Sequence, residues 1–225
     1  MAMFVPIALA IVLWLALLQK LQAKPWLVQG IAAEPGNSAT RYPAKVIGLG
    51  VFLAVVTALF TLFAAAYHMR MAVPDWSHLP LPKILWFNTA LLALSSIALQ
   101  WAWSATDRPA PGLIDIRRGL LAGASLALLF VAGQLLAWRQ LDANGFFFSC
   151  TPASAFFYLF TGLHGLHLVG GLLVLGKTTT KIYRLDLSNR TAAVAPLLLS
   201  IKLCAIYWHF LLLIWLAIFA LLFLT

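Results

Sequence analysis

Five long runs of apolar residues constrain this chain more than any other feature of its sequence. They cover residues 46–66, 84–103, 119–138, 152–176 and 203–225, and none of them contains Asp, Glu, Lys or Arg. A helix that crosses the hydrocarbon core of a bilayer needs about 20 apolar residues, and every run reaches that length. The sequence therefore predicts an all-α, polytopic integral membrane protein built as a helix bundle.

Composition excludes the soluble classes of protein. Hydrophobic residues occupy 63% and charged residues 9% of the 225 positions, against roughly 45–50% and 25% in soluble domains. A soluble fold could not bury so much apolar surface, which excludes a soluble enzyme, a disulfide-rich secreted protein and a disordered tail. The net charge of +9 predicts no nucleic-acid partner, because the cations lie between the apolar runs, where they orient membrane proteins.

A sixth apolar run, residues 4–18, is shorter. With the three residues before it, the run spans about 27 Å as a helix, just enough to cross a bilayer. A cleavable signal peptide has its positive charge before the apolar run, whereas Lys20 and Lys24 follow this one. We therefore expect six transmembrane helices in a single membrane domain, 1–225. Residues 1–43 form its N-terminal helix and loop, and residues 44–225 form a five-helix core.

The charges of the loops predict the topology. Twelve of the 15 Lys and Arg residues lie in three alternate loops, residues 19–45, 104–118 and 177–202. The positive-inside rule places these loops in the cytoplasm and both chain ends outside. Cys150 and Cys204 then lie near opposite membrane surfaces, which are ~30 Å apart. A disulfide needs Cα atoms within about 7 Å, so we expect none between them.

Three histidines, His164, His167 and His209, are the ionisable residues within the five long runs, and such residues are where function is sought first in a membrane protein. No carboxylate lies in these runs, which argues against a proton pump or an ion-coupled transporter. His164 and His167 share one helix face because they are three residues apart. Glycines beside them would let another helix approach closely: Gly162, Gly165 and Gly170.

The histidines allow two interpretations, a ligand set for haem or a metal, or interhelical hydrogen bonds. The absence of Cys, Asp or Glu nearby in the sequence favours hydrogen bonds. Counting residues at 1.5 Å each places His167 and His209 at the same depth, roughly 13 Å from the cytoplasmic side. If these two helices are neighbours, the imidazoles can approach one another across the interface. We therefore predict that His209 and at least one of His164 and His167 face the bundle interior, with protein or water partners rather than a metal.

Two of these segments resemble a known family. Residues 161–167 read Thr-Gly-Leu-His-Gly-Leu-His, and residues 207–210 read Tyr-Trp-His-Phe. Both are similar to motifs of subunit III of the haem–copper respiratory oxidases (cytochrome c or quinol oxidases). Weaker similarity at 79–82, 88–96, 117–119 and 133–138 extends the resemblance over about residues 44–225. It matches the short bacterial form with five helices, to which residues 1–18 are an addition.

The resemblance implies an accessory, non-redox subunit of aerobic respiratory electron transport in the bacterial inner membrane. Such a subunit packs on the catalytic subunit, holds phospholipids, and supports proton uptake and stability. No catalytic, cofactor-binding or metal residue is implied here, since haem and copper belong to the catalytic subunit. Its partners would be oxidase subunits I and II and membrane lipids.

The motif residues are implied to be structural: His164, His167, Tyr207, Trp208 and His209. Arg117 and Arg118 are candidate contacts for anionic lipid head groups, although the positive-inside rule alone explains these two cations as well.

Three acids common in that family are missing here. Their places are occupied by Val56, Ala137 and Leu212, so roles that rest on those acids are in doubt for this chain. Two alternative functions therefore stay open. One is a related subunit that serves a nitric oxide reductase or oxidase assembly. The other is a histidine-ligated haem-binding membrane protein.

Overall fold

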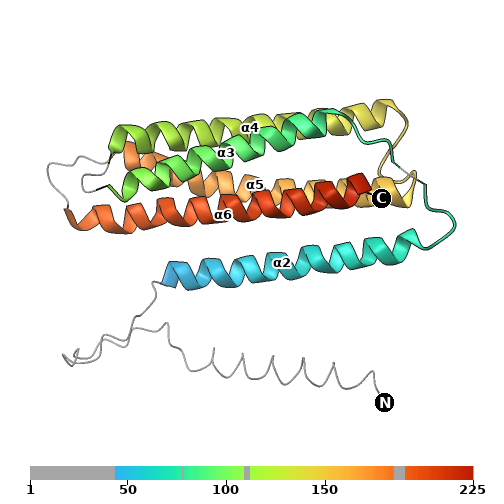
Figure 1. Cartoon of the computed structure of the whole chain (residues 1–225), viewed down its shortest axis with the longest axis horizontal. Helices are drawn as coiled ribbons and strands as arrows, with labels where there is room; N and C mark the ends of the chain where they lie inside the picture. The colour runs from blue at the N-terminus through green and yellow to red at the C-terminus, as the bar shows by residue number, and fades with distance from the viewer. Residues whose placement is uncertain (1–43, 78, 109–111, 185–190, 225) are drawn as a thin grey trace, which may run out of the picture. The chain divides into compact units, whose positions relative to one another are not determined.

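The computed structural model describes residues 44–77, 79–108, 112–184 and 191–224, which form long helices that run alternately in opposite directions (Figure 1). The helices are α2 (Ala44–Met71), α3 (Ile84–Thr106), α4 (Leu113–Ala143), α5 (Pro152–Tyr183) and α6 (Thr191–Leu224). Each is long and apolar enough to cross a membrane, and the described residues include no strand. The five-helix core predicted from the apolar runs is confirmed. The predicted N-terminal helix over 4–18 lies outside the described residues.

Several helices extend beyond the apolar runs that predicted them. Helix α4 begins six residues before its run and α5 ends seven residues after its own, while α6 begins at Thr191 and includes Pro196. An apolar run marks the part of a helix in hydrocarbon, but backbone hydrogen bonding continues into the head-group region. The start of α5 is well defined, because Thr151 and Ser154 form a reciprocal capping box and Pro152 occupies the first turn.

Glycines on α4 allow it to lie directly against α3. A methyl group at Gly119 would come within 2.8 Å of the Ala98 carbonyl oxygen. At Gly123 it would lie 2.8 Å from Leu99, and at Gly133 only 2.1 Å from the Asn88 side chain. Small residues at such a crossing let two membrane helices pack through van der Waals contact. The tight contact between α3 and α4 therefore depends on these glycines.

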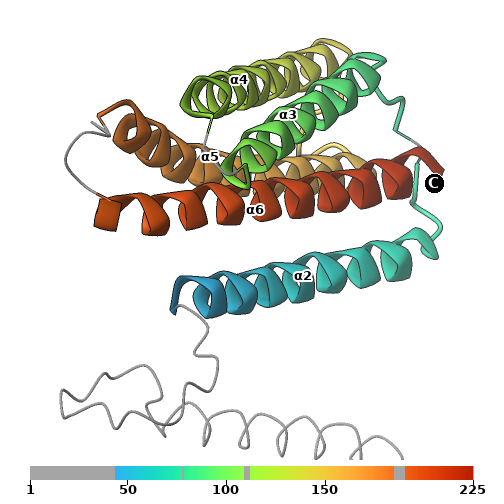
Figure 2. The same ribbon diagram turned by 60° about the vertical axis from the view of Figure 1, so that its left-hand side comes forward.

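Helices α3 to α6 form the main packed core, as the two views in Figures 1 and 2 agree. Among the described helices, backbones come within 8 Å where α3 meets α4 and α6, and where α5 meets α4 and α6. Fully buried aromatic side chains fill the space between them, including Trp208, Trp215 and Phe130. We call the end of this bundle where α4 and α6 begin the cation-rich end; its described cations include Arg117, Arg118, Lys177, Lys181 and Lys202.

Helix α2 meets the core through long side chains. From Leu49 onward it belongs to the same compact unit as the other four helices. Its buried residues Val56, Phe60 and Tyr67 pack in a second apolar cluster with Phe160 of α5 and Ile218 of α6. At the far end of α2, Arg70 forms a 2.5 Å ion pair with Asp75 in the following loop. The Arg70 guanidinium donates to this carboxyl and lowers the pKa of Asp75.

Candidate functional site

The Tyr-Trp-His-Phe segment of α6 contacts a row of polar residues on α3. Trp208 Nε1 donates to Ser95 Oγ at 2.9 Å, and the Ser95 hydroxyl donates in turn to the Gly123 carbonyl of α4 at 2.8 Å. Two turns further along α6, Trp215 Nε1 donates to Thr89 Oγ1 at 2.9 Å. Both indoles are fully buried, where an unpaired N–H would be costly. These bonds therefore set the register of α6 against α3.

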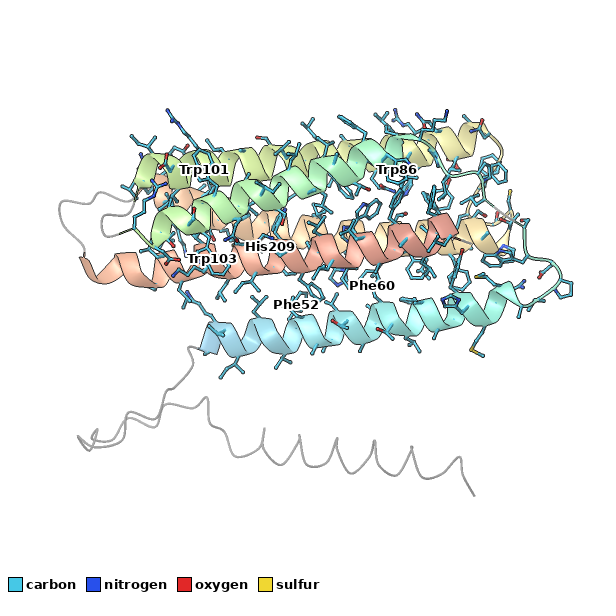
Figure 3. All side chains as sticks on the ribbon, in the orientation of Figure 1. Phe52, Phe60, Trp86, Trp101, Trp103 and His209 are labelled. Atoms are coloured by element: carbon cyan, nitrogen blue, oxygen red, sulfur yellow. The ribbon has the colours of Figure 1, made fainter. Side chains whose placement is uncertain are left out.

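His209 extends this row toward the cation-rich end, between α6 and α3 (Figure 3). Its Nε2 lies 2.8 Å from Gln100 Oε1, and its Nδ1 contacts the Ser96 hydroxyl. The ring is only partly buried. The prediction that His209 has protein partners is confirmed, but those partners belong to α3, whereas the sequence suggested the histidines of α5. The expected interior position is met only in part, because the side chain lies at the edge of the α3–α6 contact.

Tyr207 forms the link between α6 and α5. Its hydroxyl donates to the main-chain oxygen of His167 at 2.8 Å. A methyl group at Gly171 would lie 2.6 Å from the Tyr207 ring and 2.9 Å from the Trp208 ring. Gly171 therefore makes the close approach possible. The sequence assigned this role to Gly162, Gly165 and Gly170. The assignment was wrong for Gly165 and Gly170, which face open space, while a methyl group at Gly162 would lie 3.6 Å from the Trp138 ring of α4, an ordinary contact distance.

His164 is completely buried between α4, α5 and α6, which confirms its predicted interior position. Its ring centroid lies 5.9 Å from that of Phe130 and 5.2 Å from that of Trp215. Neither ring nitrogen has a hydrogen-bond partner among the described residues. A buried polar group in this condition is rare and destabilising. His164 therefore packs as an aromatic ring and bonds to no other residue described.

His167 faces helix α2. Its Nδ1 donates to the Leu163 carbonyl of its own helix at 2.7 Å. Its ring centroid lies 6.1 Å from that of Phe52 and 5.8 Å from that of Phe60, two rings that extend from α2 toward the core (Figure 3). Val56 lies one turn from each phenylalanine, so it shares their face of α2. The two motif histidines of α5 thus contact different helices.

A second polar contact was not predicted as a site. Asn88 Nδ2 donates to Gln134 Oε1 of α4 at 3.3 Å, and both side chains are buried. The signal was present in the sequence of α3, where Asn88 and Ser95, and likewise Thr89 and Ser96, are seven residues apart. Seven residues are two helical turns, so these side chains form one stripe. The stripe is the surface that α4 and α6 contact.

The two arginines proposed as lipid contacts differ in environment. Arg117 Nη2 donates to the Ile182 carbonyl at 3.3 Å, and its guanidinium lies 5.0 Å from the centroid of the Tyr183 ring. Arg118 is exposed. Lys202 of α6 forms an ion pair with Asp107 at the end of α3. Arg117 therefore binds the C-terminal end of α5, while Arg118 is available to other groups.

Comparison with known proteins decides the family. The family model for cytochrome c oxidase subunit III matches residues 2–225. The chain belongs to the cytochrome c oxidase subunit III family. It is thus an accessory membrane subunit of the haem–copper oxidase type.

Several relatives in this family are similar over much of their length. The probable cytochrome c oxidase subunit 3 of Nocardia farcinica is 28% identical over 181 residues, covering 77% of this chain and 84% of the relative. The cytochrome c oxidase subunit 3 of Thermostichus vulcanus is 29% identical over 204 residues, covering 87% and 94%. The probable subunit of Mycobacterium tuberculosis is 33% identical over 134 residues, covering 58% and 61%.

Within this subunit III member, the sites of the three missing acids are apolar in different ways. Val56 is 2% exposed and Ala137 is fully buried, while Leu212 packs at the edge of the core. No group of three or more His, Cys, Asp or Glu side chains that could hold a metal occurs among the described residues. Cys150 is exposed near the end opposite the cation-rich end, and Cys204 is buried beside Thr178. Both cysteines are free, as predicted.

Proposed function

We propose that this subunit III member packs on the catalytic subunit I of a haem–copper oxidase, together with subunit II, as a non-redox component that supports proton uptake and stability. The proposal rests on the hydrogen bonds that the motif residues make within the chain. Trp208, His209 and Tyr207 bond to α3 and α5, so their hydrogen-bonding groups hold helices together. Motif residues that hold helices together are suited to a supporting subunit. The haem and copper chemistry would then belong to its partner.

We propose that His164, His167, Tyr207, Trp208 and His209 are structural determinants of the bundle, and that phospholipid binds at the cation-rich end. His164 acts through the packing of its ring, and the other four act through hydrogen bonds. Arg118 is the better candidate for an anionic head group, because it is exposed, whereas Arg117 is engaged with α5. A surface cation contributes about 1 kcal/mol to attraction by anionic lipid. Helix α2 also supports a lipid-binding role. It contacts the core through side chains, and its outer face is apolar, as a lipid-facing surface would be.

The proposed location is the bacterial inner membrane, with the cation-rich end in the cytoplasm and both termini outside. The distribution of Lys and Arg supports this orientation. We further propose that residues 4–18 cross the membrane once before the five-helix core over 44–225, within one membrane domain. An even number of spans is what brings both termini to the same side.

Purification of the native complex tests the main proposal. The full chain, tagged at one end, is isolated from its own membranes in a mild detergent. We expect a catalytic subunit with haem and copper at one copy per copy of this chain, and oxygen consumption by the complex. Isolation of the chain with no haem-containing partner would contradict the proposal.

The missing acids favour a second candidate, service in a nitric oxide reductase or in oxidase assembly. The same purified complex distinguishes these candidates from an oxidase subunit. A nitric oxide reductase would consume nitric oxide, and an assembly factor would be absent from the mature enzyme. The haem-ligand alternative has less support, since both nitrogens of His209 are bonded to α3 and His164 is enclosed by Phe130 and Trp215. A Soret band from this polypeptide alone would favour that alternative.

A further inference from the structure

Three polar side chains form a cluster at the edge of the α3–α6 contact, from the buried Ser96 to the exposed Gln100. We call Ser96, Gln100 and His209 the α3–α6 polar cluster. The Gln100 carbonyl oxygen can only accept, so His209 Nε2 donates to it. His209 Nδ1 then accepts from the Ser96 hydroxyl. Both ring nitrogens are satisfied within the cluster, and Gln100 is its outermost member.

The cluster lies inside the hydrocarbon layer. The Lys202–Asp107 ion pair marks the cation-rich end on these two helices. His209 follows Lys202 by seven residues on α6, and Gln100 precedes Asp107 by seven residues on α3. At 1.5 Å per residue, both side chains begin about 10 Å inward from this pair. They are therefore level with each other and below the depth of a charged membrane surface.

Gln100 has hydrogen-bonding groups that the described residues do not satisfy. Its side chain is exposed and its carbonyl oxygen is bonded to His209, but no acceptor for its Nε2 amide lies in the described parts of the chain. Amide N–H groups that face lipid tails are strongly unfavourable, because hydrocarbon offers them no acceptor. Ile97 and Leu213, one turn away on the same faces, are 64% and 65% exposed. The surface thus combines exposed apolar side chains with an unpaired hydrogen-bond donor, the Gln100 amide.

Among the described helices, no other exposed side chain at this depth has an unpaired amide. Ser125 of α4 is exposed, but a serine hydroxyl can turn to a carbonyl of its own helix, whereas the Gln100 amide is held by its bond to His209. Leu128 of α4 and Leu173 of α5 are 58% and 64% exposed, and such side chains are as compatible with lipid as with protein. Thr57 and Thr61 are polar and exposed on α2, but their hydroxyls donate to carbonyls of their own helix. The exposed amide at Gln100 therefore distinguishes the α3–α6 face from the faces of α2, α4 and α5.

We propose that the α3–α6 polar cluster is the contact surface for a transmembrane helix of a partner subunit, which presents an oxygen acceptor to Gln100 Nε2. This inference rests on the proposed function, because it assigns the face by which the chain joins an oxidase. An acyl chain has no acceptor at this depth, whereas a helix can supply a side-chain hydroxyl, amide or carboxyl oxygen. Ile97 and Leu213 provide the apolar packing around that bond.

Photo-crosslinking in the intact native complex tests the assignment. A benzophenone amino acid replaces Ile97 or Leu213 in separate variants, and Leu128 or Leu173 in the controls. We expect Ile97 and Leu213 to give covalent adducts with another subunit, while Leu128 and Leu173 give adducts with lipid. Adducts of Ile97 and Leu213 with lipid only, with a second copy of this chain, or with its own residues 1–43 would each overturn the inference.

A pair of matched substitutions tests the hydrogen bond itself. Gln100→Leu removes the amide from the cluster. Gln140→Leu makes the same change at an exposed position near the C-terminal end of α4, away from the cation-rich end. We expect Gln100→Leu to speed dissociation from the detergent-solubilised complex about fivefold, the effect of one modest interhelical bond, and Gln140→Leu to leave it unchanged. Equal dissociation rates for the two variants would overturn the inference.

The two experiments separate this inference from the function on which it rests. If the wild-type chain co-purifies with a haem–copper catalytic subunit, but the Leu128 or Leu173 benzophenone variants crosslink to that subunit and the Ile97 and Leu213 variants do not, the assigned face is overturned and the function is left intact. Wild-type chain that co-purifies with no oxidase overturns both.

Discussion

The imidazole of His164 is buried at a cost that no described partner offsets. Its ring packs against Phe130 and Trp215, and neither nitrogen has a hydrogen-bond partner among the described residues. Leaving a buried polar group unpaired costs about 1–3 kcal/mol. We therefore predict that His164→Leu, which is similar in volume, raises the thermal midpoint of the purified chain by an amount that corresponds to about 1 kcal/mol. A lower midpoint would mean that the ring binds water or a partner group in the membrane.

The loss of the family glutamate at Val56 has a local consequence at His167. Val56 shares its helix face with Phe52 and Phe60, whose rings flank the His167 ring, and His167 Nδ1 is already bonded to Leu163. A carboxyl group at position 56 would therefore face the free Nε2 side of His167. We predict that Val56→Glu and His167→Phe are coupled by about 1 kcal/mol in a double-mutant cycle of unfolding in detergent. Additive effects would show that the two side chains do not meet.

At the scale of helices, adjacent glycines of α5 provide a matched test of packing. A methyl group at Gly171 would collide with the rings of Tyr207 and Trp208, whereas one at Gly170 would meet open space. We predict that Gly171→Ala destabilises the bundle by about 1–3 kcal/mol, the usual cost of overpacking. Gly170→Ala should be neutral or slightly stabilising, because alanine favours helix. Unfolding titrations of the two variants measure the difference, and equal effects would contradict the α5–α6 packing.

The same glycines show how far the sequence alone could predict the fold. Uninterrupted apolar runs revealed the five described helices, because a span must satisfy its own backbone in lipid. Periodicity also showed which residues share a face. It did not show which helix covers that face, so the sequence associated His209 with α5 and assigned close approach to Gly165 and Gly170. That choice depends on the three-dimensional register of α6 against α3, set by Trp208–Ser95 and Trp215–Thr89.

The site was predictable to a similar degree. The histidine and tryptophan motifs were visible in the sequence, since ionisable and aromatic residues stand out in apolar runs. Their polar partners Ser95, Ser96 and Gln100 were harder to recognise, because serine and glutamine are common and have meaning only when the opposite helix is known. Motif residues can therefore be found from sequence, while their contacts require the structure.

For the whole molecule, the orientation in the membrane can be tested with its native cysteines. Cys150 is exposed just before α5, and Cys204 is buried. Thr180 is exposed near the other end of α5, 28 residues after Pro152, or about 42 Å along the helix. This distance exceeds the hydrocarbon thickness of ~30 Å, so positions 150 and 180 lie on opposite sides of a membrane that α5 crosses.

We predict that a membrane-impermeant maleimide labels Cys150 from outside in intact spheroplasts, because the positive-inside rule places the cation-rich end in the cytoplasm. The Cys150→Ser variant should lose this label, since the buried Cys204 thiol is inaccessible. A Thr180→Cys change in the Cys150→Ser background should be labelled only after permeabilisation. Labelling of position 180 from outside, with Cys150 protected until the membrane is opened, would reverse the topology. The Lys202–Asp107 pair and Arg118 would then face the outer leaflet, where anionic head groups would be contacted from the opposite side of the membrane.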